Sequence, residues 1–560
     1  MLFSTVKPAL GSVAVVSFAI NLLMLTGPIF MLQIYDRVLA SGSIPTLLVI
    51  CGFAVILYSF FGIFDALRGR ILSRIGQKID IHYSGTCFDL SCRLPTMLGA
   101  KGSVFRPVQD LEQIRQFVAS PGPAMFFDMP WLPFYLALVY LFHPLLGIVG
   151  IVGALVLIAF LALNEWLSKT PSEEASKESS YRQKLAEEGR THSEAICAMG
   201  MQSALVRRWN ERNRSFLPRQ RHATDVSGVF GSATKTIRFM LQSAVLAMGA
   251  WLTIKQEISP GVMIAASILV GRALAPVEQA VSQWRGFQGA RSAYNRLSKL
   301  LELAKTKPEV MDIPLPKDNL CINSLACAPA GISKPVLHGI SFQLNAGNAV
   351  AIIGPSGVGK STLARTVSGL APPLMGDVRF DSAELERWSD EQLGDIIGYL
   401  PQEVQLFDGT IAENIARFVA DVDADSVIEA AKMASIHELI LQFPDGYDTL
   451  IGAESMSLSG GMKQRIALAR AMYGTPFLVV LDEPNSNLDA DGDSALTAAI
   501  HSLKKRGSMV IIVAHRPSAL TAVDYVLTLG EGRMKSFLPK DKALGQLVNS
   551  VPKQESNRGR

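Results

Sequence analysis

The chain carries the segment Gly354-Pro355-Ser356-Gly357-Val358-Gly359-Lys360-Ser361-Thr362, which sets the architecture of its second half. The segment fits Gly-x-x-x-x-Gly-Lys-Ser, a loop whose glycines let backbone N–H groups curl around phosphate oxygens. In such a loop Lys360 reaches the terminal phosphates of a nucleotide, and Ser361 ligates Mg²⁺. The apolar run 349–353 supplies the preceding strand, and the residues after Lys360 begin a helix whose positive end faces the phosphates. The segment therefore predicts a nucleotide-binding site.

A second apolar run, 477–481, leads directly into two acids, Asp482 and Glu483. Short unbroken apolar runs are typical of strands buried on both faces of a mainly parallel sheet. At the end of such a strand one carboxylate can hold Mg²⁺, directly or through water, and the next can polarise an attacking water. We assign the metal to Asp482 and the general base to Glu483. An exposed acidic pair is the simpler alternative, but it would not need an apolar strand aimed at it.

The first half of the chain is poor in charge and rich in apolar residues. At 560 residues the chain is too long for a single core, its charged residues amount to 18%, and its mean hydropathy is +0.26. Soluble proteins carry about 25% charged residues, so a large part of the surface must face something other than water, and lipid is the simplest candidate. A spanning helix needs roughly 20 apolar residues, and the run 129–164 is long enough for two when cut at His143-Pro144. We therefore predict six spans, at about residues 12–35, 45–65, 124–142, 145–164, 237–254 and 260–278.

Positive residues follow the second and fourth spans, whereas the turns after the first and third spans lack Lys and Arg. By the positive-inside rule both termini and the long segments 66–123 and 165–236 are cytoplasmic. A soluble helical bundle is the alternative, but soluble cores rarely contain charge-free runs of this length.

A break in the pattern at residues 305–319, rich in Pro and Lys, marks a linker. The predicted fold class is an all-α six-span transmembrane domain (1–304) followed by an α/β P-loop nucleotide-binding domain (320–540) and a polar tail (541–560). The net charge of +4 gives no ground for a nucleic-acid partner, which would need a clustered basic face. The six cysteines show neither metal-ligand spacing nor the density of a disulfide scaffold.

A further segment of the chain reads Leu458-Ser459-Gly460-Gly461-Met462-Lys463-Gln464-Arg465. Together with the P-loop and the acidic pair, this segment resembles the ABC transporter ATPase family over about residues 320–540. The resemblance implies ATP and Mg²⁺ as cofactors. It also implies that Ser459, Gly460 and Gly461 act on the γ-phosphate held by a second copy, and hence a homodimer. By the same resemblance Gln402 reaches Mg²⁺ and the attacking water, His515 is the switch histidine on the γ-phosphate, and the loop from Ser486 to Asp489 contacts the partner copy.

One position departs from the family pattern. Many ABC proteins stack adenine on an aromatic residue shortly before the first strands of the nucleotide domain, but the stretch 325–329 reads Leu-Ala-Cys-Ala-Pro. We therefore expect weaker stacking of the base, or a different contact in its place.

Three membrane-half segments, 27–38, 128–133 and 271–279, together with 485–489, resemble the type I secretion exporters of the protease and lipase branch. That resemblance implies export of an unfolded protein with a C-terminal signal from a Gram-negative inner membrane. It implies two partners, a periplasmic membrane-fusion adaptor and an outer-membrane channel. Only seven residues precede the first charge-free run, so cleavage of a leader peptide by this chain is not expected.

Two alternatives remain open at this stage. An exporter of lipid, peptide or small molecules can use the same frame, because a fold does not fix its cargo. A nucleotide-binding membrane regulator without pumping activity is the alternative from another class, and the hydrolytic pair Glu483 and His515 argues against it. The segments 94–98 and 201–216 stand where exporters dock coupling helices on the ATPase. The polar residues Asn21, Gln33 and Gln242 either line a translocation path or pack between helices.

Overall fold

The computed structural model describes residues 6–305, 313–452, 458–486, 490–514 and 520–543. The chain divides into two compact units. The first comprises the described residues of 1–90 and 106–306, and the second those of 91–105 and 307–560. The limits at residues 304 and 320 stay a prediction, because 306–312 lie outside the described residues.

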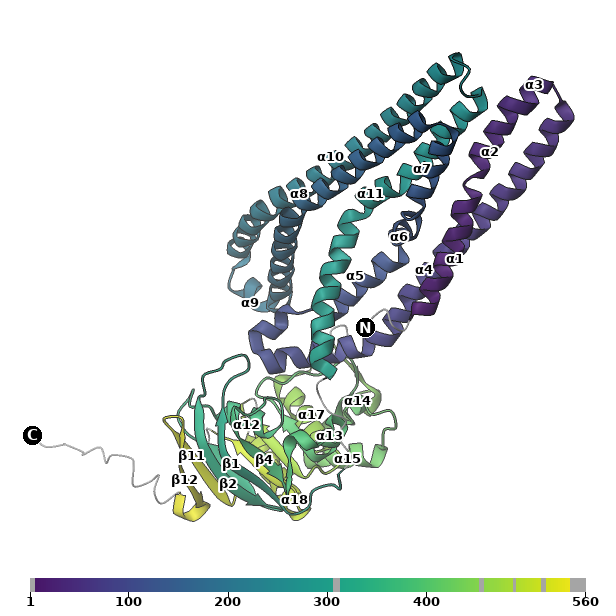
Figure 1. Ribbon diagram of the computed structural model, residues 1–560. Helices are drawn as coiled ribbons and strands as arrows, with labels where there is room; N and C mark the ends of the chain where they lie inside the picture. Colours follow the sequence, from purple (N-terminus) through teal and green to yellow (C-terminus); the bar gives the residue numbers. More distant parts are fainter. Residues whose placement is uncertain (1–5, 306–312, 453–457, 487–489, 515–519, 544–560) are drawn as a thin grey trace, which may run out of the picture. The chain divides into compact units, whose positions relative to one another are not determined.

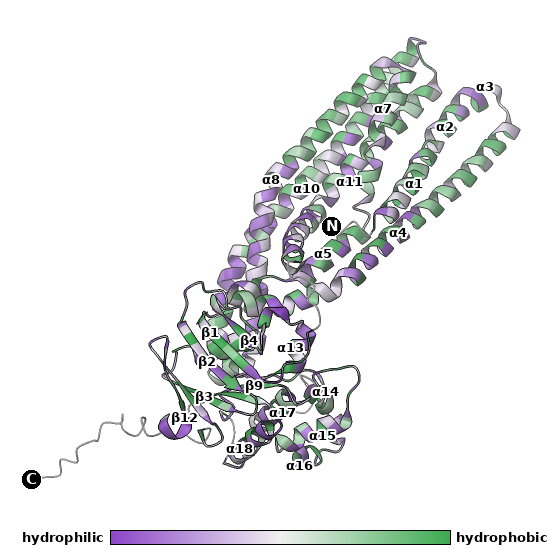
Figure 2. Cartoon of the chain, turned by 60° about the horizontal axis from the view of Figure 1, so that its bottom comes forward, coloured by the Kyte–Doolittle hydropathy of each residue, from purple (hydrophilic) through white to green (hydrophobic). Residues whose placement is uncertain are grey.

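The first unit is entirely helical, and six of its helical segments are long and apolar enough to cross a membrane (Figures 1 and 2). This confirms the predicted number of spans and the predicted fold class of this half. The segments run Lys7–Ser41, Ile44–Leu98, Ala124–Phe142, Pro144–Thr191, Gln202–Ile254 and Pro260–Glu302. The individual helices are α1 (Lys7–Leu23), α2 (Thr26–Gln33), a π-helical turn η2 (Ile34–Val38), α3 (Leu39–Ser41), α4 (Ile44–Leu98), α5 (Pro107–Ala119), α6 (Ala124–Asp128), α7 (Trp131–Phe142), α8 (Pro144–Thr191), α9 (Ser193–Ala198), α10 (Gln202–Ile254) and α11 (Pro260–Lys305).

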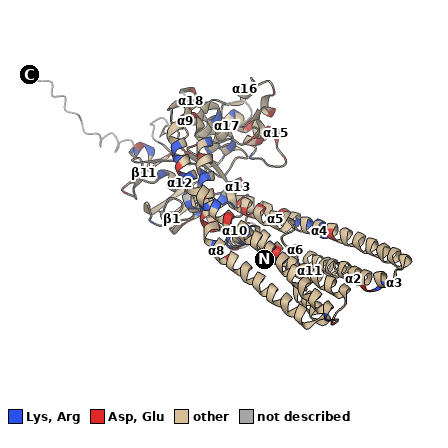
Figure 3. Ribbon diagram, turned by 90° about the horizontal axis from the view of Figure 1, so that it is seen from above, with Lys and Arg blue, Asp and Glu red and all other residues tan. Residues whose placement is uncertain are grey.

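Four of these helices are far longer than a bilayer requires. Helix α4 has 55 residues, which at 1.5 Å per residue is about 80 Å, against a hydrocarbon core of about 30 Å. Each long helix therefore combines an apolar spanning part with a charged part that continues out of the bilayer. Figure 3 shows few Lys, Arg, Asp or Glu along the spanning parts.

A buried polar network joins four helices of the first unit. Asn21 Nδ2 on α1 donates to Asp128 Oδ1 on α6 at 2.7 Å, and Tyr135 Oη on α7 donates to the Asn21 carbonyl at 2.7 Å. Arg68 on α4 donates through Nη1 to both Asp128 oxygens, at 3.1 and 3.0 Å. Asn21 is 2% exposed, so this side chain packs between helices. Gln242, in contrast, lines a cavity, and Gln33 is half-buried at the end of α2.

Asp36, in the π-helical turn η2, caps the start of α11. Its Oδ1 accepts from the Gly261 N–H at 2.9 Å, and its Oδ2 accepts from Ser259 Oγ at 2.5 Å. A carboxylate at this position satisfies free backbone N–H groups and complements the helix dipole. The cap fixes where α11 begins, and so helps to fix the register of the residues along it.

The second unit is built on a sheet of order β12-β11-β3-β10-β9-β6, in which only β12 is antiparallel to its neighbour, and a four-stranded antiparallel sheet of order β2-β1-β4-β5. This confirms the predicted α/β class. The strands are β1 (Asn319–Cys327), β2 (Leu337–Asn345), β3 (Ala349–Ile353), β4 (Met375–Phe380), β5 (Ala383–Glu384), β6 (Ile397–Leu400), β7 (Gly409–Thr410), β8 (Leu450–Ile451), β9 (Leu478–Asp482), β10 (Met509–Val513), β11 (Tyr525–Gly530) and β12 (Arg533–Pro539). The helices are α12 (Lys360–Val367), α13 (Asp390–Ile396), α14 (Ile411–Ile415), α15 (Ala424–Met433), α16 (His437–Ile440), α17 (Gly460–Met472) and α18 (Ala490–Lys505), with 3₁₀ turns η3 (Gly99–Val104), η4 (Leu385–Arg387) and η5 (Gly446–Asp448).

The central strands β3, β9 and β10 are buried on both faces, as their unbroken apolar sequences predict. Alternate residues pack into two different cores. Val479 and Ile512 face the core formed with α14, α15, α17 and α18, whereas Val480 and Ile511 face the core shared with α12 and the four-stranded sheet. The sheet is thus the middle layer of the unit, and its strand ends carry the site.

Residues 91–105, the end of α4 and the turn η3, belong to the second unit, as expected for the docking segment 94–98. Arg93 pairs there with Asp390 at 2.6 Å between Nη2 and Oδ2. The other expected docking segment, 201–216, is the continuous start of α10. The short helix at that turn is instead α9, because the chain reverses at Met199-Gly200, where Gly200 has a φ of +65°.

Candidate functional site

The P-loop connects β3 to α12 and holds a backbone conformation that favours glycine. Gly357 and Gly359 have φ values of +79° and +107°, and a Cβ on Gly359 would lie 2.9 Å from Leu337 Cγ. Gly359 is also the N-cap of α12, so the loop delivers its N–H groups to the positive end of that helix. Positive-φ glycines directly before a helix N-terminus are the backbone arrangement of a loop that binds phosphate.

Lys360 is the first residue of α12 and folds back over the loop. Its Nζ donates to the carbonyls of Gly354 at 2.9 Å and Pro355 at 3.0 Å, and the residue is 5% exposed. Burial lowers the pKa of Lys360, while the nearby Glu483 and Asp482 oppose that shift. A poorly hydrated ammonium group at the mouth of a phosphate loop is well placed to exchange its carbonyl partners for phosphate oxygens.

Asp482 is the last residue of β9 and lies against the start of α12. Its Oδ1 accepts from Ser361 Oγ at 3.0 Å, so the two predicted metal ligands are in contact. The residue is 1% exposed, and its Oδ2 has no hydrogen-bond partner within the described ranges. Burial raises the pKa of this carboxyl, with the Ser361 hydrogen bond opposing the shift and Glu483 adding to it. A buried carboxylate oxygen left without a donor is a fitting cation ligand.

Glu483 follows in a backbone conformation that is unusual for a residue with a side chain, with a φ of +54°. Its N–H donates to the Val513 carbonyl at 3.1 Å, and its Oε2 accepts from Gln402 Nε2 at 3.1 Å. Gln402 comes just after β6, which pairs with β9, and this pairing brings the two predicted catalytic residues together. The left-handed turn directs Glu483 out of the strand toward the same edge as the P-loop.

The segment 458–465, which we call the signature segment, contains the start of α17. Ser459 is the N-cap of this helix, its Oγ accepts from the Met462 N–H at 3.3 Å, and Gly460 and Gly461 form the first turn. Ser459 is exposed. In the part of the chain that the structure describes, no hydrogen bond joins Ser459 to the P-loop. Ser459 and Gly460 are thus exposed at the N-terminal end of α17.

Two predicted site residues, His515 and Asp489, lie outside the described residues. The apolar strand expected before His515 is present as β10. Pro355, Ser356, Val358 and Thr362 lie in the P-loop and the first turn of α12, as their positions in the motif predict.

Two positioning residues were not recognised in the sequence. Gln464, 3% exposed on α17, donates through Nε2 to the Pro484 carbonyl, so it ties the signature helix to the residues after Glu483. Arg417 caps the other end of α17, donating to the carbonyls of Arg470 at 2.9 Å and of Ala471 and Tyr473 at 3.2 Å. Burial lowers the pKa of Arg417. Gln464 could have been found in the sequence, because it lies within the signature segment. No motif in the sequence identifies Arg417.

Two family models match the chain. The model described as "ABC transporter" matches residues 337–486, and the one described as "ABC transporter transmembrane region" matches residues 10–274. Together they include the P-loop, the signature segment and the acidic pair.

Relatives match the chain over nearly its whole length. The type I secretion system ATP-binding protein PrsD of Rhizobium meliloti (strain 1021) is 45% identical over 551 residues, which cover 98% of this chain and 95% of the relative. The alpha-hemolysin translocation ATP-binding protein HlyB of Escherichia coli O157:H7 is 26% identical, over 96% of this chain and 76% of the relative. A solved bacterial Atm1-family ABC exporter with ATP bound superposes with a TM-score of 0.82, at 20% identity over 99% of each chain. At that identity the structural likeness shows the fold alone.

Proposed function

This chain belongs to the ABC transporter family, and from that premise we propose that it is the ATP-hydrolysing exporter of a type I secretion system. It is a multi-span membrane protein and an ATPase coupled to transport. The proposed cargo is an unfolded protein with a C-terminal signal. The observation that carries the proposal is the 45% identity with PrsD over nearly the whole of both chains, membrane half included.

The site residues fit ATP with Mg²⁺. The Oδ2 of Asp482 lacks a donor within the described ranges, Ser361 Oγ lies beside this carboxylate, and the positive-φ glycines leave backbone N–H groups free to face phosphate. ATP supplies the phosphoanhydride bond whose hydrolysis powers transport. Lys360, with the P-loop residues from Gly354 to Thr362, would hold the phosphates. Ser361, Asp482 and Gln402 would hold the metal.

Glu483 is proposed as the general base. Its carboxylate accepts a hydrogen bond from Gln402, so one amide can orient both the base and the water from which it takes a proton. The Glu483 N–H donates to the Val513 carbonyl, and this bond anchors the backbone that carries the carboxylate at the strand end. His515 would assist at the γ-phosphate.

A homodimer is proposed, because Ser459, Gly460 and Gly461 face outward at the positive end of α17 and are suited to a phosphate held by a second copy. Asp489 would contribute to the same contact between copies.

The proposed location is a Gram-negative inner membrane, with both termini and the nucleotide domain in the cytoplasm. A periplasmic membrane-fusion adaptor and an outer-membrane channel would be the partners. The proposal is supported by two relatives, one named a type I secretion system ATP-binding protein and the other an alpha-hemolysin translocation ATP-binding protein.

The test is a comparison of secreted proteins. A strain lacking this chain should lose one or a few proteins from the culture medium. The wild-type gene should restore them, whereas a gene carrying Glu483→Gln should not. An unchanged set of secreted proteins, with altered efflux of lipids or small molecules, would replace protein export with the alternative cargo class.

A further inference from the structure

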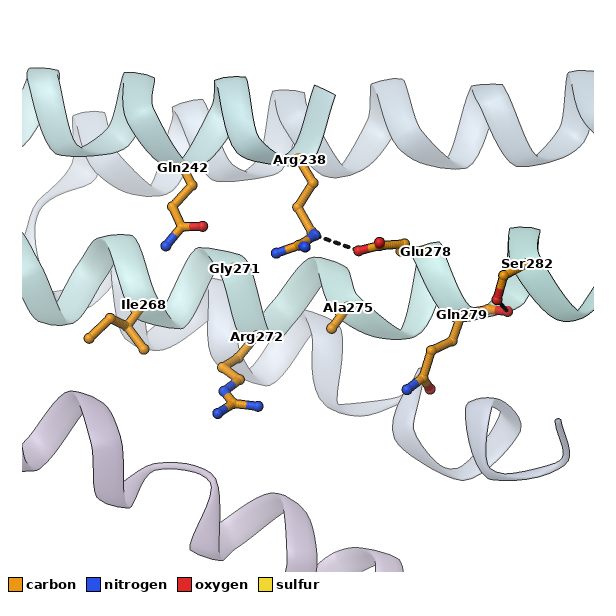
Figure 4. Close-up of a pocket in the computed structure, with 9 residues that line it drawn as sticks. All are labelled: Arg238, Gln242, Ile268, Gly271, Arg272, Ala275, Glu278, Gln279 and Ser282. Carbon is orange, nitrogen blue, oxygen red and sulfur yellow. Dashed lines mark hydrogen bonds and ion pairs between the residues drawn. The ribbon is translucent and has the colours of Figure 1, made fainter. Parts of the chain in front are cut away.

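A cavity of about 460 Å³ lies in the membrane half, and none of its residues has a role in the nucleotide site. Two helices supply the residues that line it. Helix α10 contributes Arg238 and Gln242, four residues apart, and α11 contributes one continuous face. That face comprises Ile268, Gly271, Arg272, Ala275, Glu278, Gln279 and Ser282, spaced by three or one residues as one side of a helix requires (Figure 4).

The cavity face of α11 is polar, while the opposite face is apolar. Leu274, Val277 and Val281, which alternate with the cavity residues along the same helix, are each at most 2% exposed. The cavity is deep in the span: Arg272 lies twelve residues beyond Pro260, roughly 18 Å along the helix. Charged side chains at such depth nearly always face a partner or a water-filled path and mark function.

The two arginines of the cavity differ in their partners. Arg238 Nε donates to Glu278 Oε2 at 2.5 Å, and the two side chains are 17% and 27% exposed. Arg272 is exposed, and it has no carboxylate partner among the described residues. Figure 4 shows Arg238 and Glu278 pointing toward each other, whereas Arg272 and Gln279 extend from the side of α11 away from Arg238. Two guanidinium groups against one carboxylate leave the cavity with one uncompensated positive charge.

We propose that this cavity is a subsite of the export path that takes a carboxylate of the exported polypeptide, with Arg272 as its ligand. The inference rests on the proposed function. A guanidinium group binds a carboxylate through two parallel hydrogen bonds, and outside bulk water such a pair is strong. The volume falls in the range of ligand pockets, so the cavity admits side chains of an extended chain and no folded domain.

The other lining residues favour a polypeptide over an anionic lipid. Gln242, Gln279 and Ser282 offer both donors and acceptors, which match peptide groups, while a lipid phosphate needs donors alone. The apolar side chains of the lining are Ile268 and Ala275, too small a surface for an acyl chain.

The experiment uses the full-length protein in nanodiscs of neutral phosphatidylcholine. Two fluorescein-labelled Gly-Ser peptides are compared by anisotropy, one with glutamates at alternate positions and one with glutamines in their place. The wild type should bind the glutamate peptide about tenfold more tightly, which corresponds to about 1.4 kcal/mol. Arg272→Ala should bind both peptides equally, and Arg272→Lys should keep part of the preference, because it keeps the charge and loses the two-bond geometry.

The matched control is Arg291→Ala, a change on the same helix but outside the cavity, and it should keep the full preference. The inference is overturned if Arg272→Ala keeps the preference, or if Arg291→Ala loses it equally. It is also overturned if, in nanodiscs with phosphatidylglycerol, native mass spectrometry shows that Arg272→Ala loses bound lipid while the peptide preference stays. These outcomes leave protein export intact. If the wild type binds neither peptide and the secretion comparison also fails, the proposed function itself is lost.

Discussion

The nucleotide site and the membrane cavity are both built from cations and carboxylates, but the chain assembles them in different ways. At the nucleotide site Lys360 bonds to carbonyls five and six residues before it, so a local turn fixes the geometry. In the cavity Arg238 meets Glu278 only because α10 and α11 pack side by side. A site made by a turn leaves a motif in the sequence, whereas a site made by helix packing leaves separate polar residues.

The largest effect should come from the strand end that carries the acids. Glu483→Gln keeps the size of the side chain but removes the base, so ATP hydrolysis should fall by about 10² to 10⁴ while ATP still binds. The matched control is Glu531→Gln, because Glu531 has the same φ of +54° and is 90% exposed at a turn. Steady-state phosphate release and nucleotide binding are the measurements. Normal turnover by Glu483→Gln would show that Glu483 is not the general base. It would also show that the motif does not identify the catalytic residue of the nucleotide site.

The next largest effect should be on ATP affinity and should come from Lys360, which the P-loop carbonyls hold in place. Lys360→Ala removes the charge-assisted hydrogen bonds to phosphate, each about 1.5–3 kcal/mol, so ATP affinity should fall by about 10- to 100-fold. Lys505→Ala, an exposed change at the end of α18, serves as the control. Titration with a fluorescent ATP analogue measures the ATP affinity of the two variants and of the wild type. An unchanged affinity in Lys360→Ala would show that the local turn does not place this cation at the phosphates.

This difference explains what the sequence could predict. The P-loop, the strands on either side of the site and the contact between Ser361 and Asp482 follow from motifs whose chemistry requires a fixed order of residues. The six spans follow from charge-free runs. Arg417 could not be predicted, because its role depends on where the carbonyl groups at the end of α17 lie in the folded unit.

The membrane half shows the same limit. The sequence left Asn21 and Gln242 with two possible roles, and only the packing separates them. Asn21 is hydrogen-bonded to Asp128 and Tyr135 between helices, whereas Gln242 lines the cavity. Likewise, the short helix α9 could not be distinguished from the start of α10, because the chain reversal that separates them at Met199-Gly200 is a matter of backbone conformation.

A smaller effect should separate these two membrane residues. Asn21→Leu removes a buried donor from Asp128, and hydrogen bonds between membrane helices contribute about 0.6 kcal/mol on average and up to about 2 kcal/mol. The free energy of unfolding should therefore fall by about 1 kcal/mol. Gln242→Leu, at the cavity wall, should leave it within about 0.5 kcal/mol. Thermal unfolding of the full chain in one detergent compares them. Equal losses would mean that Gln242 also packs as a structural residue.

The smallest effect is a pH dependence at Asp482. Burial raises the pKa of this carboxyl in the folded, nucleotide-free chain, so the folded state favours the protonated form. The stabilisation of the folded state that comes from the protonated Asp482 carboxyl is therefore fully present below the ordinary aspartate pKa. It is lost as pH rises through the raised pKa of the folded chain. Asp482→Asn resembles the protonated form, so it should flatten this part of the pH profile, with changes in Tm on the order of a few degrees. Asp425→Asn, an exposed change in the first turn of α15, should leave the profile as in the wild type.

Addition of Mg²⁺ with ATP should stabilise the wild type more at higher pH, where the Asp482 carboxylate is free to bind the metal. In Asp482→Asn, the stabilisation by Mg²⁺ and ATP should no longer depend on pH. A wild-type profile that matches Asp482→Asn with and without Mg²⁺ would show that this carboxyl is not the metal ligand, and the acids at the strand end would need new roles.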